Sequence, residues 1–222
     1  MKKRRPFKTI FLFLLISLFV LASLSSLSGA QSIPWEYYSK YKIVVPFSCG
    51  NLAAKLSFKV EARFRDNAHY YNKIPVGISA KVNNNWEVGL FYALKNKKNK
   101  GHWDNYHLIW PEATFHISLS SIAIDDRQRI ELHLTDRDQR YRNFLRIKFS
   151  ALNGKLIPWI GNEARYFFKR KQIAMNEVFI GLIFKPCTPL SLNVFYDYRT
   201  VKKQANRWES ANVIQTQVSY NF

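Results

Sequence analysis

Strict alternation of apolar and polar residues constrains the fold of this chain more than any other feature. The last run is apolar or threonine at its even positions, from Ile214 to Phe222, and polar at the odd positions between them. Residues 56–65 and 190–199 follow the same rhythm with few exceptions. Successive side chains of a β-strand point to opposite faces, whereas a helix repeats about every 3.6 residues. The sequence therefore predicts an all-β protein.

The alternating segments predict about ten strands. We expect them at residues 52–65, 74–82, 86–95, 106–121, 127–135, 140–149, 156–168, 177–185, 190–199 and 213–222. Short turns alternate with mostly longer loops at 66–73, 96–105, 169–176 and 200–212. Several strands have the roughly 9 to 11 residues that cross a bilayer. A break at Pro111 would divide residues 106–121 and give twelve strands instead.

Residues 35–47 form one more β-like run, which would make the number of strands odd. Eleven strands would place the two chain ends on opposite sides of a barrel, whereas an even number returns the C-terminus to the periplasm. We therefore expect residues 31–51 to form a periplasmic or lumenal segment. Residues 52–222 would then form the barrel.

Three features favour a membrane barrel over a soluble β-sandwich. First, oppositely charged residues share a face at two-residue spacing, as in Glu61 with Arg63, Arg129 with Glu131 and Glu163 with Arg165. Second, aromatic residues bound the apolar faces, as expected at the headgroup level: Trp86, Tyr92, Tyr141, Tyr166, Tyr198 and Tyr220. Third, the chain ends on Phe222 within its last strand. Together they predict a monomeric transmembrane up-and-down antiparallel β-barrel in the bacterial outer membrane.

The first thirty residues resemble a secretory signal peptide. A basic start, an apolar run from Ile10 to Ala22 and the small residues Ser28-Gly29-Ala30 follow in the usual order. We expect cleavage after Ala30. The alternative is an uncleaved anchor helix, but the apolar run is shorter than the roughly 20 residues that a spanning helix needs.

The chain is strongly basic, with 34 Lys and Arg against 15 Asp and Glu. Such a balance favours anionic partners. In an exported protein these are outer-membrane lipid, lipopolysaccharide and anionic solutes, and we expect no nucleic acid. Basic runs such as Lys95–Lys100 belong on the outer face, where we expect contact with lipopolysaccharide phosphates.

Cys49 and Cys187 are the only cysteines of the sequence. In an oxidising compartment an even pair permits a disulfide. Two unpaired thiols are an equal alternative, because pairing requires Cα atoms within about 7 Å and the sequence gives no such distance.

The charged faces predict an ionic network inside the lumen. Its expected members are Glu61, Arg63, Arg65, Arg129, Glu131, Arg140, Arg142, Arg146, Glu163, Arg165, Asp197 and Arg199. Buried ions must be paired, since desolvating each costs several kcal/mol, and a narrow barrel is largely filled by its own side chains. The network therefore predicts a structural barrel, or a conduit for small solutes in which excess arginine binds anions.

One spacing suggests catalysis. His116 and Ser118 point the same way in a strand, and Glu131 lies one hairpin away, where it could orient the histidine. Outer-membrane lipid hydrolases resemble this His-x-Ser arrangement, so a lipid hydrolase is the alternative function. The alternation nevertheless turns both residues inward, away from lipid, and we predict no enzyme. No spacing predicts a metal site, and we expect no cofactor.

Several short motifs together resemble the outer-membrane family catalogued as domain of unknown function number 2490. They are Val60-Glu61-Ala62-Arg63-Phe64-Arg65 before Asp66-Asn67, Arg129-Ile130-Glu131-Leu132, Arg140-Tyr141-Arg142 with Leu145-Arg146, Glu163 before a Phe pair, and Phe195-Tyr196-Asp197-Tyr198-Arg199. The family usually has another arginine and an aromatic where this chain has Leu132-His133-Leu134. The resemblance implies an outer-membrane barrel and no established activity. The ending Tyr220-Asn221-Phe222 resembles the terminal signal by which such barrels engage the barrel-assembly machinery.

Overall fold

The computed structural model describes residues 33–50, 52–150, 154–202 and 207–222, and the structural statements below concern these residues. The chain divides into two units, Met1–Ile33 and Pro34–Phe222. The second unit contains the described sheet. The predicted signal peptide, residues 1–30, lies outside the described residues.

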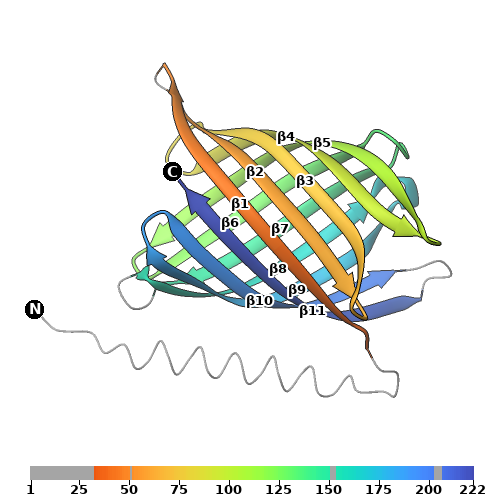
Figure 1. The fold of residues 1–222 in the computed structure, drawn as a ribbon. Helices are drawn as coiled ribbons and strands as arrows, with labels where there is room; N and C mark the ends of the chain where they lie inside the picture. Colours follow the sequence, from red (N-terminus) through yellow and green to blue (C-terminus); the bar gives the residue numbers. More distant parts are fainter. Residues whose placement is uncertain (1–32, 51, 151–153, 203–206) are drawn as a thin grey trace, which may run out of the picture. The chain divides into compact units, whose positions relative to one another are not determined.

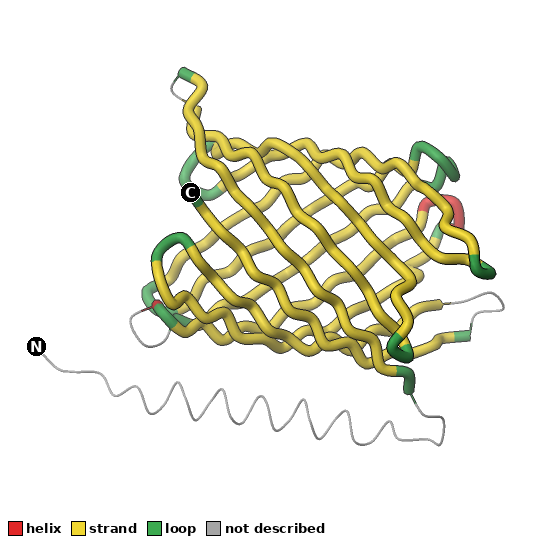
Figure 2. The backbone as a smooth tube through the Cα atoms, viewed as in Figure 1, coloured by secondary structure: helices red, strands yellow, loops and turns green. Residues whose placement is uncertain are grey.

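The described wall consists of eleven strands. They are β1 (Trp35–Cys49), β2 (Leu52–Arg65), β3 (Ala68–Lys81), β4 (Trp86–Asn99), β5 (His102–Leu119), β6 (Ile122–His133), β7 (Gln139–Phe149), β8 (Leu156–Phe167), β9 (Gln172–Cys187), β10 (Leu190–Lys202) and β11 (Trp208–Asn221). A short 3-10 helix, η2 (Phe168–Arg170), joins β8 to β9. Figure 2 shows strand along most of the wall, with turns gathered at its two ends. Among the described residues, no helix is long and apolar enough to cross a membrane.

The strands close into an all-β barrel, and β1 is the strand that closes it (Figure 1). It pairs antiparallel with β2 and parallel with β11, where Trp35 lies beside Asn212 and Val44 beside Asn221. The prediction that residues 31–51 lie outside the wall is therefore wrong for β1. Whether the number of strands is odd or even decides only whether the two strands that close the barrel run parallel or antiparallel. An odd number of strands closes through a parallel ladder, which also pairs the backbone groups of both strands.

The observed number of strands lies between the predicted ten and twelve. The twelve-strand alternative is wrong, because Pro111 lies within the single strand β5. The pairing of β5 with β6 passes from Ile109 to Glu112 and omits the two residues between them. Proline has no backbone N–H to donate, so β5 tolerates it where this ladder is interrupted.

The barrel has a C-terminal rim, where β11 ends, and an opposite rim, where β1 begins. At the opposite rim, Asp66 and Asn67 join β2 to β3, with φ of 50° and 59°. Lys100 and Gly101 join β4 to β5, with φ of 48° and 91°. Turns with two left-handed residues match the twist of a hairpin. The expected loops at 66–73 and 96–105 are therefore mostly strand, because these tight turns let the polar residues beside them stay in the ladder.

The outer face of the wall is largely apolar. Phe58, Val76, Leu90, Val178 and Val194 lie near the middle of their strands and are exposed. Their neighbours in sequence point inward, and these include the half-buried Lys59 and the buried Glu177. This arrangement inverts the usual soluble protein, in which apolar side chains fill the interior.

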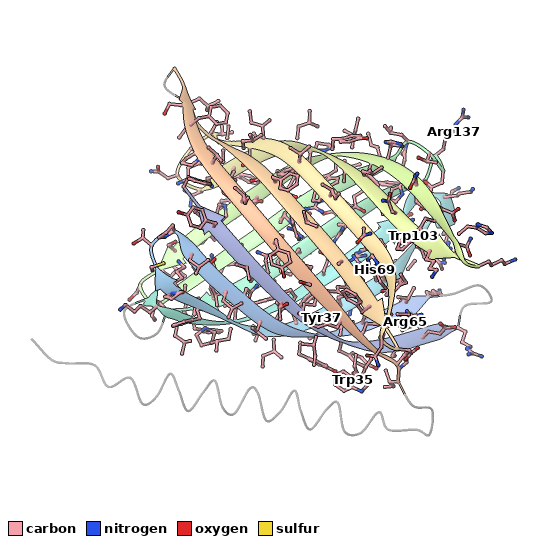
Figure 3. All side chains as sticks on the ribbon, viewed as in Figure 1. Trp35, Tyr37, Arg65, His69, Trp103 and Arg137 are labelled. Carbon is pink, nitrogen blue, oxygen red and sulfur yellow. The ribbon has the colours of Figure 1, made fainter. Side chains whose placement is uncertain are left out.

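Aromatic side chains border the apolar face near both rims. Toward the opposite rim, ring contacts link Tyr37 to Phe64, Phe64 to His69 and His69 to Trp103, with centroids 5.2–6.2 Å apart. Figure 3 shows Trp35 and Tyr37 on the outside of β1. At the C-terminal rim, Trp86 contacts Phe115 and Tyr220 contacts Phe222. Two such belts are typical of transmembrane barrels.

Candidate functional site

The lumen contains a network of ion pairs, and Arg199 on β10 joins three strands within it. Its guanidinium donates to Glu177 at 2.6 Å, to Glu36 at 3.1 Å and to Asp197 at 3.1 Å. These carboxylates lie on β9, β1 and β10, and they are all buried together with Arg199. Tyr38 also accepts a hydrogen bond from Arg199. Because charges buried in this way require partners, Arg199 fixes the position of β1 against β9 and β10.

A chain of alternating charges continues the network around the wall. Arg142 donates to Glu131 at 2.5 Å and to Glu163 at 2.6 Å. Arg165 then links Glu163 to Glu177. On the other side of the lumen, Lys73 on β3 reaches Glu131 on β6, with a nitrogen to oxygen distance of 3.7 Å. The network thus spans the barrel as well as following its wall.

Opposite charges two residues apart pair with each other, as the sequence indicates. Arg63 contacts Glu61 at 2.5 Å, Arg165 contacts Glu163 at 2.6 Å, and Arg129 contacts Glu131 at 3.5 Å. Residues i and i+2 of a strand share a face, so the alternation itself creates these pairs.

Each predicted member of the ionic network forms an ion pair: Glu61, Arg63, Arg65, Arg129, Glu131, Arg140, Arg142, Arg146, Glu163, Arg165, Asp197 and Arg199. The sequence reasoning missed Glu36, Lys73, Asp125 and Glu177. The predicted elements place Glu36 in a periplasmic or lumenal segment, Lys73 in a loop and Asp125 in a turn. For Glu36, Lys73 and Asp125 the signal was present, because each falls on the inward side once the alternation is extended to the true strand ends. Glu177 begins the predicted strand 177–185, and no charged residue stands at two-residue spacing from it within that strand.

A cavity of about 320 Å³ lies within the lumen beside this network. Its lining includes ten Lys and Arg side chains but only four Glu side chains. Lys42 lies beside Lys59 in the β1–β2 ladder, and Lys40 donates to Gln215. Lys42 forms no ion pair or hydrogen bond with another described residue, and Lys59 reaches Glu61 only at 3.8 Å. The β1–β2 side of the cavity therefore presents cationic charge that the barrel does not neutralise.

Aromatic rings also line the cavity. Phe91 lies over Gly77, and Trp159 and Phe195 lie on either side of Gly181. A Cβ atom at Gly181 would stand 2.5 Å from the Phe195 Cβ and 2.6 Å from the Trp159 ring, closer than side chains can approach. Glycine at this position makes room on the wall for both rings, which line the cavity.

The sequence matches the family described as "Protein of unknown function (DUF2490)" over residues 35–210. The chain belongs to the DUF2490 family. The matched region begins at β1, so it includes the closing strand and the lumen network. No curated protein matches the sequence.

Two solved structures resemble this DUF2490 barrel. One is described as "KdgM porin", with a TM-score of 0.45 and 14% identity, covering 83% of this chain and 99% of that chain. The other, described as "Unveiling the Mechanism Behind the in-meso Crystallization of Membrane Proteins", has a TM-score of 0.38 and 12% identity, and it covers 75% of this chain and 71% of that chain. The assignment of a closed barrel rests on the observed strand pairing itself.

The catalytic candidates of the DUF2490 barrel do not come together. His116 pairs through Nδ1 with Asp125 at 2.9 Å, and these two residues are direct neighbours in the β5–β6 ladder. Glu131 lies six residues further along β6, roughly 20 Å away at strand spacing, and takes part in the ionic network. The prediction that Glu131 orients His116 is therefore wrong. Ser118 forms no hydrogen bond with His116 among the described side chains.

The two cysteines end different strands at the C-terminal rim. Cys187 ends β9 and its side chain is exposed. Cys49 ends β1, its side chain lies outside the described residues, and β11 and β10 separate its strand from β9. A bond between Cys49 and Cys187 stays a prediction. Within the described residues, no group of three or more His, Cys, Asp or Glu could hold a metal ion.

Proposed function

We propose that this protein is an outer-membrane β-barrel whose lumen conducts small anions. The apolar outer face between two aromatic belts supports insertion into a bilayer, because a closed barrel satisfies its backbone hydrogen bonds internally. The cleavable signal peptide that we infer for residues 1–30 would deliver the chain to the periplasm. The barrel-assembly machinery would then engage its C-terminal strand, where Phe222 is 70% exposed.

The observation that carries the conduit is the excess of cationic side chains around the lumenal cavity. Lys42 and Lys59 face that cavity without close carboxylate partners, so a passing phosphate or carboxylate would supply the missing charge. Pores that select anions commonly use such lysine and arginine linings. A purely structural barrel is the competing role, since the remaining lumenal arginines are neutralised within the network. The lipid hydrolase has no support from the geometry, because His116 pairs across the ladder with Asp125.

Conductance of the purified protein in a planar bilayer tests this function. We expect discrete channels whose reversal potential under a KCl gradient indicates chloride over potassium. Replacing both lumenal lysines (Lys42→Glu with Lys59→Glu) should reverse or abolish that selectivity. Lys98→Glu, near the β4–β5 turn at the opposite rim, is the matched control and should change selectivity little. A protein that inserts but stays electrically silent would leave only the structural role.

A further inference from the structure

A cluster of polar side chains interrupts the apolar outer face across β6, β7 and β8. Gln128, Asn143 and Asn162 lie on successive strands and occupy outward positions, and Asp126 stands two residues before Gln128. We call these four residues the mid-wall polar patch. Asp126 alternates with the inward-pointing Asp125 and Arg127, whose ion pairs lie in the lumen. The outward placement of the patch therefore follows from strand geometry.

The patch lies at the middle of the wall rather than at a rim. Gln128 is the seventh of the twelve residues of β6, Asn143 the fifth of eleven in β7, and Asn162 the seventh of twelve in β8. Near the middle of other strands, outward residues such as Phe58, Val76, Leu90 and Val194 are apolar. If the barrel crosses a membrane as proposed above, these amides face the centre of the hydrocarbon layer.

Hydrogen bonds within the patch satisfy only some of its polar groups. Gln128 donates through Nε2 to both carboxylate oxygens of Asp126 at 2.8 Å, and Asn143 donates to Asp126 at 2.7 Å. Asn162 donates to the Asn176 side chain at 2.9 Å and to the Glu177 carbonyl oxygen at 3.1 Å, and Gln128 Oε1 accepts a hydrogen bond from the Tyr141 hydroxyl. The Asn143 Oδ1 atom accepts no hydrogen bond from a described residue, and a second N–H of Asn143 is also left over. Lipid tails offer no partner for these groups, so an exposed patch would be costly.

We propose that a second copy of this chain covers the mid-wall polar patch. Two copies in one membrane are related by an axis along the membrane normal, which keeps every residue at its own depth. Asn143 and Asn162 of one barrel would thus meet the same residues of the other. Asn143 keeps one N–H and its Oδ1 without a partner among the described residues, so it is complementary to its own copy, and Asn162 offers its Oδ1 as a further acceptor. Asp126 is already held by amides of its own chain and lies to one side of such a contact.

Other occupants fit this surface less well. A lipid cannot bond the amides at this depth, because its polar groups lie at the membrane surfaces. A different protein would have to present amides or hydroxyls at the matching depth, a condition that the patch itself meets automatically. A contact between two copies replaces the monomer expected from the sequence, and it rests on the proposed location in a membrane.

Oligomeric state in lipid tests the proposal. Purified full-length protein is reconstituted into nanodiscs or vesicles, and the number of copies per particle is counted by single-molecule photobleaching. We expect dimers for the natural chain and at least a tenfold loss of dimer for the double variant Asn143→Leu with Asn162→Leu. Asn212→Leu on β11, an outward amide away from the patch, is the matched control and should stay dimeric. Slower migration after boiling on a denaturing gel reports that each variant is folded.

The outcomes separate this proposal from the function on which it rests. A natural chain that inserts and stays monomeric overturns the contact between copies and leaves the membrane barrel intact. Dimers that persist in the double variant place the interface elsewhere and also overturn it. A chain that never enters lipid removes both proposals.

Discussion

Arg199 shows how a single side chain can hold several strands together. It joins carboxylates from β1, β9 and β10 in a part of the lumen where Asp197 has no exposed surface. The loss of one partner from a buried ion cluster usually costs more than the cluster contributes, because the remaining charges stay buried without compensation. The three carboxylates around Arg199 therefore depend on it more than any exposed pair depends on its partner.

We predict that Arg199→Ala destabilises the barrel by about 3–5 kcal/mol, the usual cost of breaking a buried pair. Urea unfolding in lipid vesicles, followed by tryptophan fluorescence, measures the loss. Arg137→Ala is the control, because Arg137 is exposed in a turn at the opposite rim (Figure 3) and its removal should cost less than about 0.5 kcal/mol. Equal effects of the two substitutions would contradict the assigned role of Arg199.

Gly181 leaves space on the wall for the Trp159 and Phe195 rings, which line the cavity. We predict that Gly181→Val displaces Trp159 or Phe195 into the cavity and lowers the single-channel conductance several-fold. A smaller loss is expected for Gly181→Ala, which adds only the Cβ atom. Ala113→Val, on an outward position of β5, adds similar bulk on the lipid side and should leave conductance unchanged. Unchanged conductance in Gly181→Val would show that these rings do not border the path.

At the level of single elements, β1 completes the barrel. It supplies Glu36, Tyr38, Lys40 and Lys42 to the lumen and both ladders that close the wall. Without β1, the edges of β2 and β11 would be left open, and open edges are not tolerated in lipid.

We predict that Tyr41→Pro prevents the barrel from closing. Tyr41 lies between Val60 of β2 and Val218 of β11, and proline there removes an N–H and distorts a ladder. The folded band seen on a gel without boiling should disappear. Ser48→Pro is the control, since Ser48 lies beyond the last residue paired with β11 and should permit folding. Normal folding of Tyr41→Pro would mean that β1 is not an essential wall strand.

At the scale of the whole molecule, basic side chains at the opposite rim indicate how the barrel is oriented in the membrane. The ends of β4 and β10, together with η2, place Lys97, Lys98, Lys169, Arg170 and Lys202 at the opposite rim. We propose that this rim faces the cell exterior and contacts lipopolysaccharide phosphates, because each lysine near an anionic surface contributes about 1 kcal/mol.

Charge reversal at this rim tests the contact. Lys97→Glu with Lys98→Glu should weaken retention in membranes that contain lipopolysaccharide, and it should have little effect in neutral lipid vesicles. Co-sedimentation with each type of membrane measures the difference. Lys81→Glu, at the C-terminal end of β3, is the control and should behave like the natural chain. Equal retention of all variants would contradict the proposed contact.

The sequence by itself determined the β class, the inward face of most strands and the pairing of charges two residues apart. These follow from the two-residue period of a strand, which is a local property. Glu61 with Arg63 and Glu163 with Arg165 are therefore readable without coordinates.

Only the tertiary structure decided how the sheet closes, which carboxylates meet Arg199 and where the cavity lies. Glu36 and Arg199 are 163 residues apart, and their contact exists because β1 pairs beside β11. No local pattern distinguishes a parallel closing strand from a segment outside the wall. Closure depends instead on the register of all the strands together, and that register sets which distant side chains share the lumen.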